Sequence, residues 1–215
     1  LATPKGLWHT ERFPGSAAGP QMRDIVAGSE GILGVIIEAI VKIHPAPEVK
    51  DYRGYLFMDF AAGVAAAREM MQTGVQTAMI RLSDENETRF YTALTLGGQE
   101  PDPSVRFCAM LVGLEGSPAE VAHALGESRA IIEKHGGMHM GESLGENWYK
   151  GRFETPYLRD PMMDRGLGVD TLETATHWSN LLRLHDITAK ALSDALDAHA
   201  AAPGAGTLPR TARRR

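Results

Sequence analysis

The segment Gly28-Ser29-Glu30-Gly31-Ile32-Leu33-Gly34-Val35-Ile36 carries three glycines at intervals of three residues, together with one carboxylate. Glycine adopts left-handed backbone conformations at little cost and lets another molecule lie close to the main chain. A loop of this kind can turn several backbone N–H groups toward one acceptor, such as a pyrophosphate. The β-branched run from Leu33 to Ile43 predicts a buried strand, which would hold the loop at the edge of a sheet.

Two common phosphate-binding loops do not match this segment. The dinucleotide fingerprint needs glycines at positions one, three and six before a helix, and the Walker loop needs Gly-Lys-Ser or Gly-Lys-Thr. Here the glycine spacing differs from both, no lysine follows the last glycine, and the next element is predicted to be a strand. The same spacing also suits a tight turn before a strand, so this alternative stays open beside a nucleotide-binding loop.

The distribution of charge argues against a nucleic-acid-binding protein. The 215 residues include 22 basic and 27 acidic side chains, which gives a net charge of −5. Four of the basic residues are Arg210, Arg213, Arg214 and Arg215, so residues 1–209 carry 18 basic against 27 acidic side chains. Because neutralisation of phosphates dominates binding to nucleic acids, we expect no nucleic-acid partner.

The single cysteine, Cys108, excludes an internal disulfide and a thiolate metal cluster. It lies in the apolar run 105–114, which predicts a small residue of the core. No apolar run approaches the roughly 18 residues needed to span a bilayer, and residue 1 does not begin a signal peptide. We therefore expect a cytoplasmic protein without a transmembrane segment.

Hydrophobic periodicity and turn residues predict an α+β architecture after Pro45 and Pro47. The first 27 residues, rich in glycine and proline, show no clear strand or helix. Beyond the prolines we expect strands at residues 52–60, 78–82, 105–114, 138–141 and 167–173, and helices at 61–72, 84–94, 118–135, 142–152, 157–163 and 178–199. The alternation of strands and helices is typical of a ferredoxin-like sheet with helices on one face.

Two helix starts carry capping signals. Ser117 is followed by Pro118 and, three residues after the serine, by Glu120, which predicts a capping box. Asp84 with Glu87 predicts a second one. The last helix is predicted to bury one face, formed at intervals of three or four residues by Leu181, Leu184, Ile187, Ala191 and Ala195.

The longer segment GSEGILGVIIEAIVKIHPAPE, residues 28–48, resembles the GSEGTLGVITE segment of FAD-linked oxidases that share the vanillyl-alcohol-oxidase (VAO/PCMH) type of flavin domain. Ile32 and Ile37 stand where threonines are usual in that family. The resemblance implies FAD as the cofactor, with contacts from Gly28, Ser29, Glu30, Gly31, Ile32, Leu33, Gly34, Val35 and Ile36. It implies that residues 1–47 form the C-terminal part of the FAD-binding domain and residues 48–199 an incomplete ferredoxin-like cap domain. Residues 200–215 are expected to form a disordered tail.

Three further elements narrow the resemblance to the alkylglycerone-phosphate synthase branch of that family. They are Ile80-Arg81-Leu82-Ser83-Asp84, Tyr157-Leu158-Arg159-Asp160, and residues 168–175 followed by Trp178. In that branch the arginine of the second element is implied to bind substrate, which assigns this role to Arg159. A guanidinium offers a rigid fork of donors matched to phosphate or carboxylate oxygens. The alternative is a surface ion pair of Arg159 with Asp160 or Glu154.

The resemblance implies a reaction in which the acyl group of acyl-dihydroxyacetone phosphate is exchanged for a fatty alcohol, with FAD and without net redox change. The substrate would be a small phosphorylated or carboxylated molecule, and a homodimer is one expected assembly. The branch also has a first half of the flavin domain, a catalytic tyrosine and a histidine-rich segment, none of which has a counterpart in this sequence. We therefore expect a fragment that is inactive alone.

Two alternatives stay open. One is an FAD-linked 2-hydroxy-acid dehydrogenase of the D-lactate or glycolate type, and the other is a non-enzymatic α+β module left by a decayed gene. The histidines favour neither zinc binding nor hydrolysis. Gly136 and Gly137 deny His135 and His139 a shared helix face for a metal, and no Ser/His/Asp set is suggested.

Overall fold

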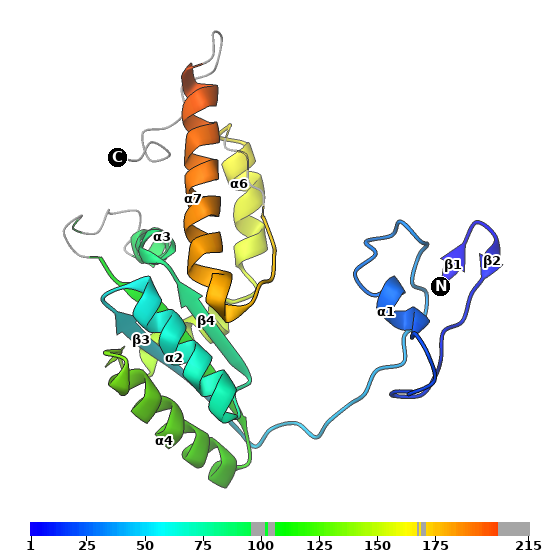
Figure 1. Cartoon of the computed structure of the whole chain (residues 1–215), viewed down its shortest axis with the longest axis horizontal. Coiled ribbons are helices and arrows are strands. Elements are labelled where there is room, and N and C mark those ends of the chain that lie inside the picture. The colour runs from blue at the N-terminus through cyan, green and yellow to red at the C-terminus, as the bar shows by residue number, and fades with distance from the viewer. Residues whose placement is uncertain (96–101, 103–105, 167, 169–170, 202–215) are drawn as a thin grey trace. The chain divides into compact units, whose positions relative to one another are not determined.

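The computed structural model describes residues 1–95, 102, 106–166, 168 and 171–201. The chain divides into two compact units, Leu1–Ala46 and Pro47–Arg215 (Figure 1). Each unit is described by itself. The predicted tail from residue 200 onward lies outside the described residues except for its first two positions, where the last helix ends.

The first unit contains little regular structure. Strands β1 (Ala2–Thr3) and β2 (Gly6–Leu7) form an antiparallel pair, and α1 (Met22–Val26) is a helix of five residues. The prediction of no strand or helix in the first 27 residues is therefore wrong for these short elements. Val26 is the one buried apolar side chain of the unit, so its own hydrophobic core is minimal.

The strand predicted from Leu33 to Ile43 is not formed. Val35 makes an isolated bridge to Ala2, with N–H···O distances of 2.8 and 2.9 Å, and the rest of the run pairs with nothing in this unit. Its side chains are exposed: Ile40 is 66% and Ile43 84% accessible. A strand needs an edge to which its main chain can bond, and a hairpin of two-residue strands supplies too little of one.

The second unit is built on a four-stranded sheet, as the α+β prediction requires. Its strands are β3 (Val49–Phe57), β4 (Met79–Ser83), β5 (Cys108–Gly116) and β6 (Met138–His139), in the order β4-β5-β3-β6. All neighbouring pairs are antiparallel, and the longest pairing runs from Val49 opposite Gly116 to Phe57 opposite Cys108. The connection from β3 to β4 therefore passes over β5, and the connection from β5 to β6 passes over β3.

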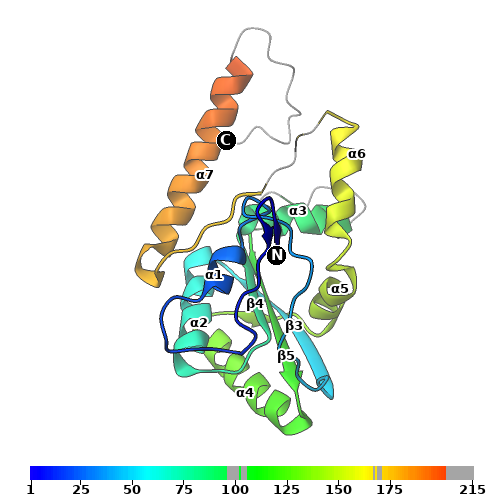
Figure 2. The same cartoon turned by 90° about the vertical axis from the view of Figure 1, so that its right-hand side faces the viewer.

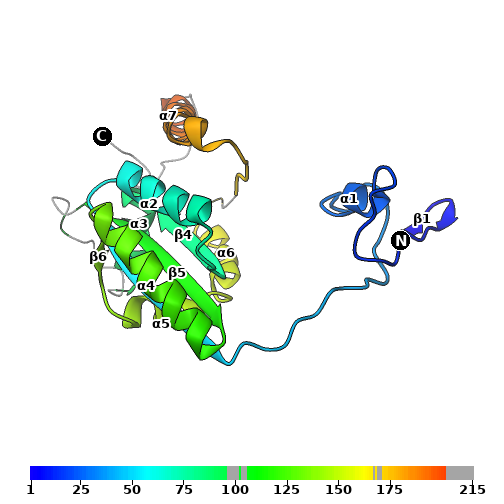
Figure 3. The same ribbon diagram turned by 60° about the horizontal axis from the view of Figure 1, so that its bottom comes forward.

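Helices α2 (Phe60–Thr73) and α4 (Pro118–Lys134) lie side by side on one face of this sheet (Figure 3). Their local sequences explain their limits. Asp59 caps α2 by accepting the N–H of Ala62 at 2.8 Å, and Gly74 ends it with φ of 83°. The core between helices and sheet includes fully buried Tyr55, Phe57, Met70, Met110 and Ile132.

The remaining helices are α3 (Glu85–Thr95), α5 (Ser143–Gly151), the 3₁₀ helix η1 (Thr155–Leu158), α6 (Arg159–Met163) and α7 (Trp178–Ala201). Figure 2 shows α5 beside the sheet, where it packs against β3. A Cβ added to Gly145 of α5 would lie 2.1 Å from the carbonyl oxygen of Tyr52. Only glycine therefore permits this close approach.

Two predictions about the C-terminal part are wrong. Of the strand expected at residues 167–173, Gly168 and residues 171–173 are in no strand, while Leu167, Val169 and Asp170 lie outside the described residues. On α7, Leu181 and Leu184 are half-buried, but Ile187 is 52% accessible and Ala191 and Ala195 are exposed. Figure 1 shows why: the later turns of α7 extend past the end of the sheet.

Candidate functional site

The glycine loop of the first unit has the backbone conformation that its sequence predicts. Gly28, Gly31 and Gly34 have φ of 81°, 87° and 145°. Glu30 has φ of 48°, the one positive φ of a non-glycine residue in the part of the chain that the structure describes. Glu30 and Gly31 are thus consecutive residues with positive φ, and such left-handed positions give turns that can form an anion-binding concavity.

Part of the loop is already bonded to itself. The N–H groups of Ser29, Ile32 and Gly34 donate to the carbonyls of Val26, Ser29 and Gly31 at 3.1, 3.0 and 3.3 Å, and that of Val35 donates to Ala2. Within the described chain, the amides of Gly28, Glu30, Gly31, Leu33 and Ile36 have no hydrogen-bond partner. The loop can therefore offer an anion five donors, and those of Glu30, Gly31 and Leu33 lie between its first and last glycines.

The space around the glycines separates their roles. A Cβ added at Gly28 or Gly31 would meet no atom within 4 Å, so another molecule can approach the backbone there. A Cβ at Gly34 would lie 2.4 Å from the carbonyl oxygen of Ala2, so packing within the unit already requires that glycine. Ile32 is 85% accessible and contributes no buried contact of its own.

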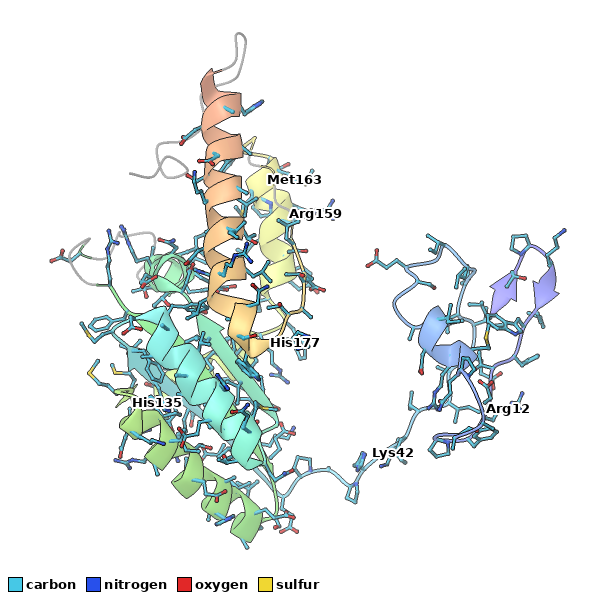
Figure 4. The ribbon with its side chains drawn as sticks, in the orientation of Figure 1. Arg12, Lys42, His135, Arg159, Met163 and His177 are labelled. Atoms are coloured by element: carbon cyan, nitrogen blue, oxygen red, sulfur yellow. The ribbon has the colours of Figure 1, made fainter. Side chains whose placement is uncertain are left out.

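A groove of about 570 Å³ lies in the same unit and includes Ile36, the last residue of the loop. Its walls are mainly apolar, with Trp8, Phe13 and Ile40 among them. Three cations also line it: Arg12, Arg23 and Lys42, two of which are labelled in Figure 4. Two carboxylates, Glu11 and Glu38, line it as well, so the groove combines apolar walls with side chains of both charges.

Arg159 is the first residue of α6 in the second unit, and its side chain is exposed (Figure 4). It makes no hydrogen bond or ion pair with any described residue, so the alternative pairing with Asp160 or Glu154 is not formed. By contrast, Arg165 at the other end of the helix donates to the carbonyl of Pro161 at 2.7 Å. The guanidinium of Arg159 is thus available to an anionic ligand.

The glycine loop and Arg159 belong to different units, and the structure gives the surroundings of each one separately. Arg81, the arginine of the element Ile80 to Asp84, is in the second unit and is engaged already. Its guanidinium lies 2.5 Å from Oε1 of Glu87 and 5.4 Å from the centre of the Tyr91 ring. The ion pair of Arg81 with Glu87 thus lies within the second unit.

A polar groove of about 190 Å³ between β3 and α5 was not predicted. Lys50 donates to the hydroxyl of Tyr149 at 3.1 Å, and this hydrogen bond lowers the pKa of Tyr149. Burial and a 2.7 Å hydrogen bond to Glu115 raise the pKa of Tyr52 to about 12. The groove is lined by β3 and by α5 with its cap, which lie far apart in the sequence, so only the i to i+2 spacing of Lys50 and Tyr52 indicated that two of its residues share a face.

The charges of this polar groove balance each other. Its remaining charged residues pair as Arg53 with Asp51 and Glu142, and as Lys150 with Glu146.

A second groove, of about 590 Å³, lies along α7 and is mainly apolar; its walls include Phe60, Trp178, Leu181 and Leu192. Neither groove leaves a charged side chain without a counter-charge to attract a ligand.

His135, His139 and Cys108 each contact other residues of the fold, as structural residues do. His135 bonds Glu69 at 2.7 Å, and the ring of His139 lies 5.3 Å from that of Tyr55. Cys108 is fully buried, as predicted, and burial raises the pKa of its thiol to about 12. Among the described residues, no group of three His, Cys, Asp or Glu could hold a metal ion. Nor is any described helix both long and apolar enough to cross a membrane.

Comparisons with known proteins agree with the resemblance. Residues 46–204 match the family model described as FAD linked oxidases, C-terminal domain. An alkyldihydroxyacetonephosphate synthase from Dictyostelium discoideum is 31% identical over 199 residues, which cover 85% of this chain and 33% of that protein. One from Caenorhabditis elegans is 29% identical over 200 residues, covering 84% of this chain and 34% of that protein.

A solved structure of an alkyldihydroxyacetonephosphate synthase superimposes with a TM-score of 0.67 at 28% identity, over 89% of this chain and 39% of that one. The chain therefore spans about a third of the length of the relatives that it matches.

Proposed function

Because the chain belongs to the family of FAD-linked oxidases, through the C-terminal domain of that family, we propose that it forms part of an FAD-dependent enzyme of the alkylglycerone-phosphate synthase kind. Residues 1–47 would be the end of the FAD-binding domain and residues 48–199 an incomplete cap domain of ferredoxin-like topology. The observation that carries the proposal is the similarity to two alkyldihydroxyacetonephosphate synthases over more than four fifths of the chain.

The glycine loop is the proposed contact with FAD. The amides of Glu30, Gly31 and Leu33 would donate to the negatively charged linker of the cofactor, and the open space beside Gly28 and Gly31 would let it approach the backbone. The residues present fit this part of the group, and the three cations of the neighbouring groove outnumber its two carboxylates. When bound, FAD would supply the reactive centre, while the protein supplies position and charge.

Arg159 is the proposed substrate residue. The guanidinium can present two parallel N–H donors to one phosphate or carboxylate group, a geometry that an ammonium cannot reproduce. Its place at the start of α6 adds the partial positive charge of the helix N-terminus only weakly, because this helix has five residues. The substrate would thus be a small anionic molecule, and dihydroxyacetone phosphate esters are the expected class.

The role of Arg159 is tested by calorimetric titration of the chain with dihydroxyacetone phosphate. Arg159→Ala should weaken binding by about tenfold or more, since charge-assisted hydrogen bonds contribute about 1.5–3 kcal/mol. Arg165→Ala is the matched control, because Arg165 lies in the turn just after the same short helix and bonds a main-chain carbonyl. Equal affinity of the Arg159→Ala variant and the unchanged chain would contradict the assignment.

Two further measurements distinguish the alternatives. Reduction of a redox dye by D-lactate or glycolate would indicate a 2-hydroxy-acid dehydrogenase, whereas the proposed exchange reaction reduces no dye. A purified chain that shows no flavin absorbance in the visible region, even after incubation with FAD, would favour the non-enzymatic module.

A further inference from the structure

Asp84, the residue before α3, contacts two helices through its two carboxylate oxygens. Its Oδ1 accepts the N–H groups of Asn86 at 2.9 Å and Glu87 at 2.7 Å, and so caps α3. Its Oδ2 lies 3.2 Å from Nε2 of His185, a residue of α7 that follows 101 positions later in the chain. One half-buried carboxylate therefore serves both the start of α3 and the docking of α7.

His185 is the main polar attachment of α7 among the described residues. Its ring stacks on Phe60, the first residue of α2, with the ring centres 4.4 Å apart. Its Nδ1 lies 3.3 Å from Oδ1 of Asp186 on the same helix. Trp178 packs against the core, whereas Leu192 and Leu196 are 48% and 43% accessible. The attachments described for α7 thus lie mainly in its first turns.

The contacts of Asp84 extend through Glu87 to Arg81 of β4. The side chain of Glu87, whose own N–H is bonded by Asp84, does not return to the cap but binds the guanidinium of Arg81 at 2.5 Å. Tyr91, one turn further along α3, faces the same guanidinium. A continuous set of contacts therefore joins His185 to Arg81 through Asp84 and Glu87.

We propose that Asp84 couples the docking of α7 to the position of the Arg81 guanidinium. If α7 leaves its site, the Asp84 carboxylate loses the partner of Oδ2 and gains freedom to rotate. Its Oδ1 then holds the first turn of α3 less well, and Glu87 releases Arg81. The coupling needs no contact between α7 and Arg81, because polar networks of this kind transmit a change through shared members.

The test replaces His185 by Phe in the full chain, which keeps the stacking on Phe60 and removes the contact with Asp84. His177→Phe is the matched control, since His177 is exposed beside the start of α7 (Figure 4). Amide hydrogen exchange of Asn86 and Glu87 should become about fivefold faster in His185→Phe, because the helix cap is weakened, and should not change in His177→Phe. The Nε–H resonance of Arg81 should shift in the first variant alone.

Faster exchange in α7 with an unchanged first turn of α3 would overturn the proposal, because docking and capping would then be independent. Unchanged exchange in both helices would overturn it too, since His185 would then not anchor α7. Should His185→Phe fail to fold, the same exchange measurement on Asp84→Asn tests the proposal. The amide oxygen can still cap α3, but the charge that faces His185 is lost. The proposal expects faster exchange in the first turns of both helices; a change in α7 alone contradicts it.

Discussion

Ser117 determines how the longest sheet-covering helix begins. Its hydroxyl accepts the N–H of Glu120, and the Glu120 carboxylate accepts the N–H of Ser117 at 2.9 Å, so the predicted capping box is complete. Ser117→Ala should lower the free energy of unfolding by about 1 kcal/mol, because it leaves the N–H group of Glu120 without an acceptor. Urea denaturation of the variant measures this loss.

Ser179→Ala is the control for this variant. Ser179 is an exposed serine at the second position of α7, and its replacement removes a hydroxyl without removing a cap. Equal destabilisation by the two substitutions would show that Ser117 acts through something other than its capping bonds.

The second predicted capping box shows the limit of local sequence at this scale. Asp84 does cap α3, but Glu87 binds Arg81 of the preceding strand and does not complete the box. The spacing of Asp84 and Glu87 cannot reveal a competing cation that the fold brings close. The local sequence therefore predicted the cap by Asp84, whereas a tertiary contact determined that Glu87 binds Arg81.

At the scale of elements, α2 and α4 are joined at their C-terminal ends through one carboxylate. Lys134 donates to both oxygens of Glu69 at 2.7 and 2.9 Å, and His135 bonds Oε2 at 2.7 Å. The hydrogen bonds from Lys134 and then from His135 lower the pKa of Glu69. A depressed pKa contributes stability that is present above the unfolded-state pKa, about 4.3, and is lost as the pH falls through the folded-state value.

Glu69→Gln should therefore be less stable than the unchanged chain at neutral pH, and this difference should disappear in acid. Urea denaturation over a series of pH values measures it. Glu127→Gln is the control, because the ion pair that Glu127 makes among the described residues is with His123 of the same helix, at 3.5 Å, and not with α2. A Glu69→Gln difference that stays constant over the whole pH range would contradict this role.

Most elements of the second unit could be predicted, because periodicity and capping residues act over short distances. Helix α4 begins after its predicted cap and ends at Lys134, one residue before the predicted end, and β5 overlaps the predicted strand at 105–114 from Cys108 onward. The strand predicted from Leu33 to Ile43 was wrong, because local preference does not decide whether a strand finds a partner. Its residues have strong strand preference, but a strand also needs an edge to pair with, and the preference of a segment cannot supply one.

At the scale of the whole molecule, the hydrophobic core belongs entirely to the second unit. We therefore predict that deleting residues 1–46 leaves the midpoint of thermal unfolding of residues 47–215 unchanged. Circular dichroism of the shortened chain and the full chain provides the comparison. A shortened chain that loses cooperative unfolding would show that the first unit contributes to the stability of the second.

The candidate site could be predicted only in its local parts. The positive φ values of the glycine loop follow from its glycines, and Arg159 was assigned from a four-residue element. The internal bonds that occupy Ser29, Ile32, Gly34 and Val35 could not be foreseen, because they depend on how the loop turns and on its bridge to Ala2. Of the nine residues predicted to contact FAD, Gly28, Glu30, Gly31, Leu33 and Ile36 have an amide that bonds no described residue, and the contact of all nine with FAD stays a prediction.

The most direct test of the account follows the backbone amide resonances of the full chain during a titration with FAD. The account predicts that the resonances of Glu30, Gly31 and Leu33 shift in a saturable way, while those of Ser29 and Ile32, whose N–H groups are bonded within the loop, shift less. If these three resonances stay in place, with FAD bound elsewhere or not bound at all, the glycine loop is not a cofactor site and the proposed function loses its basis in this chain.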